Sequence, residues 1–277
     1  MCWSATLPNG TVGEAALLDP VRTRPECIPG LSTRRLLLLR ARIGCVRGSS
    51  FECLSVAMQL PLFDPPDTSS ATPAPSFASL SEARTAALAC TRCGLSRIRR
   101  QVVFGAGAAP ARLFVLGEGP SESDDTSGEP FSGPSGHVLN SWLSTMATSR
   151  AEVWISNVLR CRAPEPGGQR AQNRPPRPSE VKSCRYWLDI ELAFVSPEVV
   201  LCLGATPGRV LLGRGFKLRQ DRGKWATGPG CVPVLPTYNP AYLLRLRSSQ
   251  RAEAEAAVSA DLRLVRARLG VADSPPP

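Results

Sequence analysis

The order of apolar segments predicts an α/β protein, a three-layer α/β/α sandwich around a central, mainly parallel four-stranded sheet. Four short apolar runs have the length of buried strands. Segments long enough to hold helices separate them, and helices that alternate with strands return the chain across the sheet, so the strands run parallel. The predicted strands cover residues 113–116, 153–156, 199–203 and 232–235.

Helical segments lie between and around these strands. Proline fits the first turn of a helix because it lacks a backbone N–H, so Pro178 followed by Ser179 and Glu180 marks a helix start. The last helical segment is amphipathic and rich in Ala, Arg and Glu. The predicted helices cover residues 80–89, 136–146, 178–194, 205–212 and 249–269.

Composition divides the chain into three parts. The N-terminal part shows no sustained period, and residues 64–78 (DPPDTSSATPAPSFA) have the composition of a flexible linker. We therefore predict a disordered extension and linker over residues 1–79, a folded domain over residues 80–270 and a disordered tail over residues 271–277. Because Met58 stands shortly before the linker, one hypothesis is that translation begins there.

Charge and cysteine content restrict the function. Lys and Arg outnumber Asp and Glu by 33 to 23, for a formal net charge of +10, which favours a polyanion such as nucleic acid; codon bias toward Arg is the alternative. The 10 cysteines lie scattered, which fits metal ligands in a reducing compartment better than the disulfide framework of a small secreted protein. The longest apolar run near the start, residues 36–39, is too short to span a membrane. We expect a soluble, cytoplasmic protein.

Polar side chains follow three of the predicted strands. Glu118 and Gly119 open a glycine-containing acidic loop whose charge is unsuited to phosphate, so the loop is not a P-loop. Asn157 follows the second strand, and a side-chain amide offers the donor and acceptor that suit the edge of a pyrimidine. Asn239, fixed by Pro240, follows the fourth strand. Each residue alone also fits an ordinary turn or cap, so both interpretations stay open.

Four cysteines have the spacing of metal ligands. Cys90 and Cys93 form a C-x2-C pair, and Cys161 and Cys184 lie far downstream. Such a pair fixes two thiolates at one corner of a metal site, and two remote thiolates complete it. The spacing alone fits zinc about as well as an iron–sulfur cluster.

These loops and cysteines together resemble the iron–sulfur uracil-DNA glycosylases, the family 4 or thermostable type. The resemblance runs in order from the first C-x2-C cysteine to Arg245 and includes both loops, the Asn motif after the second strand and all four cysteine positions. It implies that residues 80–270 form a glycosylase domain that removes uracil from DNA in base-excision repair. It also implies a [4Fe–4S] cluster, whose ligands would be Cys90, Cys93, Cys161 and Cys184.

The resemblance further implies how uracil-containing DNA is held. A base inside a duplex is unreachable, so its nucleotide must be flipped into a pocket. Phe131 would stack on the base, Asn157 would pair with its polar edge, and backbone amides around Gly119 would help to bind it. Leu243 would fill the space left in the duplex, and Arg245 would contact a phosphate.

Two residues are implied to act on the glycosidic bond. Cleavage builds positive charge on the sugar and negative charge on the base, and fixed groups that match both charges lower the barrier. Glu118 would lie near the sugar and the attacking water. Asn239 stands where family members usually have a histidine that donates to uracil O2; an amide can still donate, but losing a well-placed donor typically costs ~10²–10³ in rate.

Three alternatives follow from this departure and from the cysteine spacing. The first is a glycosylase with altered base preference owing to Asn239. The second is a weakened or noncatalytic DNA-damage binder that retains the fold and the cluster. The third is a zinc-stabilised nucleic-acid module without a base pocket.

A second interaction is indicated before the linker. The sequence QLPLF, from Gln59 to Phe63, resembles the pentapeptide by which bacterial repair proteins bind the replication sliding clamp. A clamp ligand benefits from a flexible tether, which the linker provides. We expect the protein to act as a monomer in the bacterial cytoplasm, associated with the nucleoid.

Overall fold

The computed structural model of the chain describes residues 77–166 and 172–271, which belong to one compact unit. The expectations for the N-terminal extension, the start at Met58 and the clamp motif from Gln59 to Phe63 lie outside the described residues. They stay predictions.

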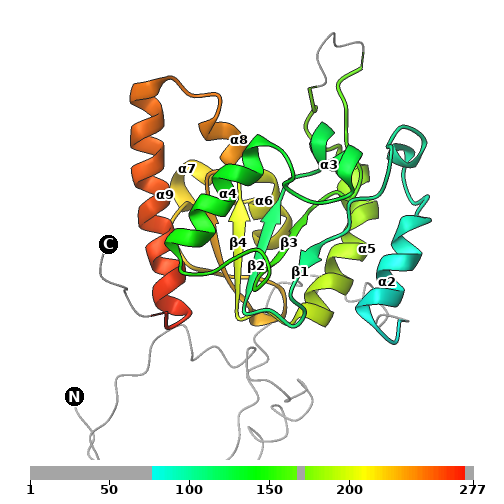
Figure 1. Cartoon of the computed structure of the whole chain (residues 1–277), viewed down its shortest axis with the longest axis horizontal. Coiled ribbons are helices and arrows are strands. Elements are labelled where there is room, and N and C mark those ends of the chain that lie inside the picture. The colour runs from blue at the N-terminus through cyan, green and yellow to red at the C-terminus, as the bar shows by residue number, and fades with distance from the viewer. Residues whose placement is uncertain (1–76, 167–171, 272–277) are drawn as a thin grey trace, which may run out of the picture. The chain divides into compact units, whose positions relative to one another are not determined.

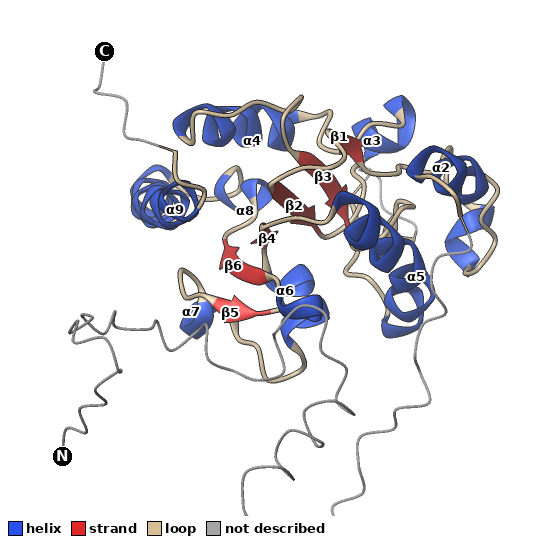
Figure 2. Cartoon of the chain, turned by 90° about the horizontal axis from the view of Figure 1, so that it is seen from below, coloured by secondary structure: helices blue, strands red, loops and turns tan. Residues whose placement is uncertain are grey.

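Six strands form one mixed sheet in the order β1-β3-β2-β4-β6-β5. Figure 1 labels β1, β2, β3 and β4, and Figure 2 also labels β5 and β6. The four central strands run parallel, which confirms the predicted sheet. A two-residue strand pairs antiparallel at each edge; two residues are too few to leave a periodic signal in the sequence. The strands are β1 (Ala106–Gly107), β2 (Leu113–Gly117), β3 (Trp154–Asn157), β4 (Val199–Leu203), β5 (Ala226–Thr227) and β6 (Pro233–Thr237).

Helices cover both faces of the sheet (Figure 2), which confirms the three-layer sandwich. One face packs against α2 (Leu80–Leu88), α5 (Pro178–Val195) and α6 (Ala205–Leu212). The other packs against α4 (Pro134–Thr145) and α9 (Ser248–Arg268). Shorter elements are the 3₁₀ turns η3 (Gly94–Arg97) and η4 (Pro229–Cys231) and the helices α3 (Glu122–Ser127), α7 (Leu218–Asp221) and α8 (Pro240–Leu243).

The predicted helices form with starts and ends within two residues of expectation. Pro178 occupies the first turn of α5, and the Glu180 carboxylate accepts a hydrogen bond from the Arg177 N–H at 2.8 Å, which stabilises that start. Within the described part of the chain, no helix has both the length and the apolar character needed to cross a membrane.

The two cores meet in β2. Phe114 and Leu116 belong to the core on the α2–α5–α6 face, and Leu113 and Val115 belong to the core on the α4–α9 face. All four are at most 2% exposed, so the strand is a continuous apolar run without alternation. A sheet sealed on both faces leaves its carboxyl edge as the place where polar loops can form a site.

Candidate active site

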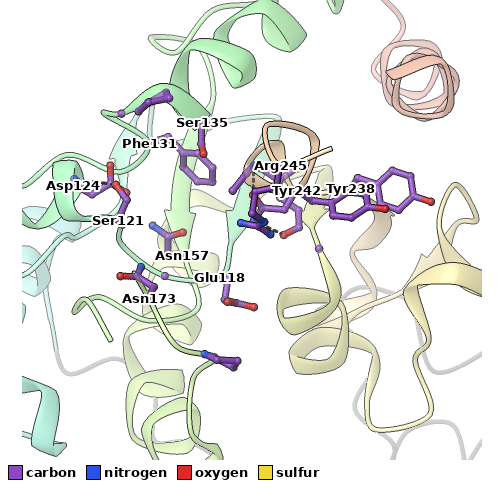
Figure 3. Close-up of a pocket in the computed structure, with 18 of the residues that line it drawn as sticks. Glu118, Ser121, Asp124, Phe131, Ser135, Asn157, Asn173, Tyr238, Tyr242 and Arg245 are labelled. Carbon is purple, nitrogen blue, oxygen red and sulfur yellow. Dashed lines mark hydrogen bonds between the residues drawn. The ribbon is translucent and has the colours of Figure 1, made fainter. Parts of the chain in front are cut away.

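The carboxyl ends of the parallel strands open into one pocket (Figure 3). In the strand register Gly117 lies opposite Asn157, and Leu203 lies opposite Thr237, so the segments that leave these strands start side by side. The sequence-predicted residues that line the pocket are Glu118, Gly119, Phe131, Asn157, Asn239 and Arg245.

Asn157 ends β3 with its side chain in the pocket and only 2% of its surface exposed. Its Nδ2 amino group has no hydrogen-bond partner among the described residues. A buried donor without an acceptor costs about 1–3 kcal/mol. The group therefore favours a ligand that brings a carbonyl oxygen into the pocket.

Gly117 leaves the space in which Asn157 and Phe131 meet. A Cβ atom at position 117 would lie 2.3 Å from Asn157 Oδ1 and 2.6 Å from Phe131 Cζ. Both distances are well inside van der Waals contact, so any side chain there would have to displace the amide and the ring. The amide and the aromatic ring therefore face one small volume of the pocket.

Phe131 has an uncommon backbone conformation. Its φ of 55° lies in the left-handed region, which costs of order 1–3 kcal/mol for a non-glycine residue. Arg150 holds this loop by donating from Nη2 to Pro130 O at 2.6 Å and from Nη1 to Phe131 O at 3.3 Å. Asp124 Oδ1 also holds it by accepting from the Ser132 N–H at 2.7 Å. The backbone of the loop that carries the ring is thus held by contacts within the protein itself.

Asp124 ties two walls of the pocket together, and sequence reasoning missed it. The residue is 4% exposed and lies in the first turn of α3. Its Oδ2 accepts from the Ser121 N–H at 2.9 Å, while Ser121 Oγ accepts from the Asp124 N–H at 3.2 Å. The S-x-x-D spacing of this capping box was the available signal.

Glu118 and Asn239 present polar groups with partners already in place. The Thr206 hydroxyl, in the first turn of α6, donates to the Glu118 carboxylate. Asn239 caps α8: its Oδ1 accepts from the Ala241 N–H at 2.8 Å, and its Nδ2 donates to Leu203 O at 3.2 Å. These unlike partners orient the amide, and one N–H of Nδ2 is left for a ligand.

Leu243 does not line the pocket, and its predicted role as a wedge is wrong. It is 1% exposed and belongs to the same core as Leu139 of α4 and Val258 of α9. A wedge must reach into a duplex, which a side chain sealed in the core cannot do. The residues of this turn that reach solvent are Tyr242 and Leu244, at 39% and 40% exposure.

Asn173 closes another part of the pocket from the insert between Cys161 and Cys184. Its Nδ2 donates to Pro120 O at 2.7 Å, and its Oδ1 accepts from Arg162 Nε at 3.0 Å. The insert has no periodic pattern, so nothing in the sequence indicated that Asn173 would line the pocket.

The four predicted metal ligands converge on a second, small cavity. Cys90 and Cys93 lie between α2 and η3, Cys161 follows β3, and Cys184 lies on α5. Among the described residues, no group of three or more His, Cys, Asp or Glu is placed to hold a single metal ion. Four thiols that line one cavity form a ligand set that both zinc sites and iron–sulfur clusters use.

The surroundings of these cysteines also fit a cluster. Hydrogen-bond donors approach three of the four sulfurs: Trp187 Nε1 lies 3.2 Å from Cys90 Sγ, the Arg160 N–H 3.3 Å from Cys184 Sγ and Arg99 Nη1 3.5 Å from Cys161 Sγ. Burial raises the pKa of the Cys161 thiol to about 12 and raises the pKa of Cys184 as well. Such thiols become thiolates beside strong positive charge, which a bound metal centre would supply.

A buried ion pair joins the pocket to this cavity. Arg160 Nη2 lies 2.9 Å from Glu191 Oε1, and the two side chains are 2% and 0% exposed. Arg160 Nη1 also donates to the Asn157 carbonyl, while its backbone N–H donates to Cys184 Sγ. Arg160 therefore contacts both the backbone of Asn157, whose side chain lines the pocket, and a cysteine that lines the second cavity.

Comparison with known proteins identifies the family of the chain. The family model described as Uracil DNA glycosylase superfamily matches residues 104–263, more than half of the chain. This chain belongs to the uracil-DNA glycosylase superfamily. The Type-4 uracil-DNA glycosylase of Thermotoga maritima is 36% identical over 162 residues, which are 58% of this chain and 81% of the relative.

Other type-4 members of the superfamily are similar to a comparable extent. The Type-4 uracil-DNA glycosylase of Pyrobaculum aerophilum is 32% identical over 56% of this chain and 80% of its own length. The corresponding protein of Sulfurisphaera tokodaii is 30% identical over 60% of this chain and 76% of its own length. The resemblance to the type-4 group that the motifs indicated is confirmed.

Replacement of Glu191 by Gln should destabilise the protein strongly. The change leaves the Arg160 guanidinium buried without its counter-charge, and breaking a buried pair in this way costs about 3–5 kcal/mol. Chemical denaturation monitored by circular dichroism measures the loss of unfolding free energy. The control is Glu198→Gln, which breaks the exposed pair with Arg112 and should leave the unfolding midpoint nearly unchanged. Equal midpoints for the two variants would contradict the importance given to the buried pair.

Proposed function

We propose that this protein hydrolyses the N-glycosidic bond of uracil in DNA, as a step of base-excision repair. Its type-4 relatives are named for uracil-DNA glycosylase activity. The observation that carries the proposal is Asn157, a buried amide with an unpaired Nδ2 donor beside the Phe131 ring. Uracil presents its O4 acceptor next to its N3–H donor, and a side-chain amide matches that edge with one donor and one acceptor.

Base flipping is part of this proposal. Asn157 is 2% exposed, so only a base that has left the helical stack can reach it. The flipped pyrimidine stacks on Phe131, whose ring is held by the contacts of Arg150 and Asp124 with its loop. Because these contacts exist in the protein alone, little ordering remains to be done when the base enters.

Charge complementarity supplies the chemistry. Glu118 faces the sugar, where its carboxylate stabilises the positive charge that develops and orients the water that attacks the anomeric carbon. The Thr206 hydroxyl holds that carboxylate. The free N–H of Asn239 donates to uracil O2 as negative charge grows on the departing base, and Arg245, exposed at the rim, contacts a phosphate.

The decisive assay incubates the purified full chain with oligonucleotides that carry one uracil, in single- and double-stranded form, followed by alkali. Strand breaks at uracil show base removal, whereas DNA binding without strand breaks identifies a damage binder instead.

Asn157→Ala should lower the single-turnover rate at least ~10²-fold, because the paired edge of the base loses its partner. Asn157→Asp, of the same size but without the donor, should fall comparably. Unchanged rates in both variants would remove Asn157 from the mechanism.

Asn239→His should raise the rate of uracil excision by about tenfold or more. A histidine can cap α8 through one ring nitrogen, as Asn239 does with Oδ1, and donate from the other toward uracil O2. Single-turnover kinetics of both proteins measure the change. Substrates with thymine, hypoxanthine or xanthine belong in the same experiment. If the natural protein excises one of these bases faster than uracil, its base preference is altered. A rate for Asn239→His below that of the natural chain contradicts this account.

We further propose that Cys90, Cys93, Cys161 and Cys184 ligate a [4Fe–4S] cluster. Four thiols that line one cavity, with N–H donors at three of the sulfurs, support this ligand set. When bound, such a cluster supplies cross-links between the chain after α2, the chain after β3 and α5. Hydrolysis needs no electron transfer, so the cluster's role here is structural.

Cys184→Ser should abolish the brown colour and the visible absorbance of the purified protein and lower its melting temperature. The matched control is Cys202→Ala, since Cys202 is a buried free thiol in β4 that does not line the cavity. That variant should keep the absorbance. Iron and sulfide analysis of both variants gives a readout independent of glycosylase activity. A colourless natural protein that contains zinc would support the zinc module instead.

A further inference from the structure

Two tyrosines on either side of Asn239 form an aromatic surface that the mechanism above does not use. Tyr238 and Tyr242 both line the pocket, with ring centroids 5.1 Å apart and ring planes inclined by 38°. Figure 3 shows the two rings beside Arg245, on the side of the pocket away from Phe131. We call this pair the tyrosine ledge.

A buried acid fixes the inner ring of the ledge. The Arg222 guanidinium carbon lies 5.1 Å from the centroid of the Tyr238 ring. Arg222 Nη1 lies 2.5 Å from Asp261 Oδ2, and the Thr237 hydroxyl donates to the same oxygen at 2.6 Å. Asp261 is 3% exposed, so the contact that orients Arg222 is anchored in the core. Tyr238 therefore packs between an arginine anchored in the core and the ring of Tyr242.

The outer ring of the ledge is available to a ligand. Tyr242 is 39% exposed, and Tyr238 is its single aromatic partner among the described residues. In the same part of the chain neither hydroxyl makes a hydrogen bond, so the rings are positioned by their contact with each other and by the Arg222 guanidinium beside Tyr238. An exposed aromatic ring beside a nucleic-acid pocket is suited to stacking on a base, which typically strengthens binding about fivefold to over a hundredfold per base.

Positive charge lies beside the ledge. Arg219 of α7 and Arg245 are both exposed, both line the pocket, and neither forms an ion pair within the described residues. A nucleotide next to the flipped one is joined to it by a phosphate. Guanidinium groups at the rim are placed to hold such a phosphate while the neighbouring base lies on an aromatic ring.

We propose that the tyrosine ledge is a stacking subsite for one unpaired base directly adjacent to the flipped uracil nucleotide. This inference rests on the proposed function, since it names the strand state of that substrate. A base that is paired and stacked in a duplex gains little from a second stacking partner, whereas an unpaired base gains the full contact. The ledge therefore favours single-stranded DNA.

The test uses the full chain with its cofactor and single-stranded oligonucleotides that contain one 2′-fluoro-deoxyuridine, which resists hydrolysis. In two further strands a tetrahydrofuran abasic residue replaces the base on the 5′ side or on the 3′ side of that uracil. Fluorescence anisotropy measures binding. For the natural protein, removal of the base on the stacked side should weaken binding by about tenfold. Tyr242→Leu should show that weakening on the intact strand and no further loss when the same base is missing.

Two control variants separate the ring from other effects. Tyr242→Phe keeps the ring and should keep the dependence on the neighbouring base. Leu264→Ala removes a side chain of similar exposure, 41%, on α9 outside the pocket, and should bind all strands as the natural protein does. Binding by Tyr242→Leu should fall less on a duplex than on a single strand.

Each other outcome overturns the ledge. Equal binding of Tyr242→Leu and the natural protein to every strand removes Tyr242 from recognition. If Tyr242→Leu loses the same amount of binding on all strands, whether or not the neighbouring base is present, Tyr242 contributes to another DNA contact or to the fold and not to stacking on that base. The parallel excision assay with ordinary uracil reports on the proposed function separately: absence of strand breaks defeats that function, while the anisotropy series still decides the ledge.

Discussion

The buried ion pair between Arg160 and Glu191 is the contact on which both sites depend. Removing two charges from water costs several kcal/mol per ion, so such a pair persists only where further hydrogen bonds surround it. Glu191 accepts from the Gly105 N–H and from Trp154 Nε1, each at 3.1 Å, and Arg160 donates to the Asn157 carbonyl. These hydrogen bonds orient both side chains of the pair. The pair in turn holds α5 against the chain that follows β3 and against the segment that precedes β1.

The chain that leaves β3 connects the two sites within a few residues. Asn157 faces the pocket, Arg160 enters the ion pair, and Cys161 faces the second cavity. Cys184 approaches from α5 and accepts from the Arg160 N–H. A cluster that holds Cys161 and Cys184 therefore also limits the movement of the segment that carries Asn157. Positioning the amide would give the proposed cluster a function in a hydrolase that does not use its electrons.

The central sheet could be predicted because its strands are buried on both faces, and burial leaves continuous apolar runs such as 199–203. Because parallel strands end at the same edge, the meeting of Glu118, Asn157 and Asn239 followed from the fold. The contacts that orient these side chains could not be predicted in this way. Asn173 reaches Pro120 from an insert without periodicity, and its position depends on a path through space that local sequence does not encode.

The wedge error has the same origin at a smaller scale. In the sequence Tyr242, Leu243, Leu244, two adjacent leucines differ only in direction, and each step along a helix turns a side chain by about 100°. The start of α8 sets that phase, and the Asn239 cap, through its bond to the Ala241 N–H, sets the start. Leu243 consequently faces the core, and Tyr242 faces the pocket rim. The residue proposed to donate to the base thus also decides which side chain of this turn lines the pocket.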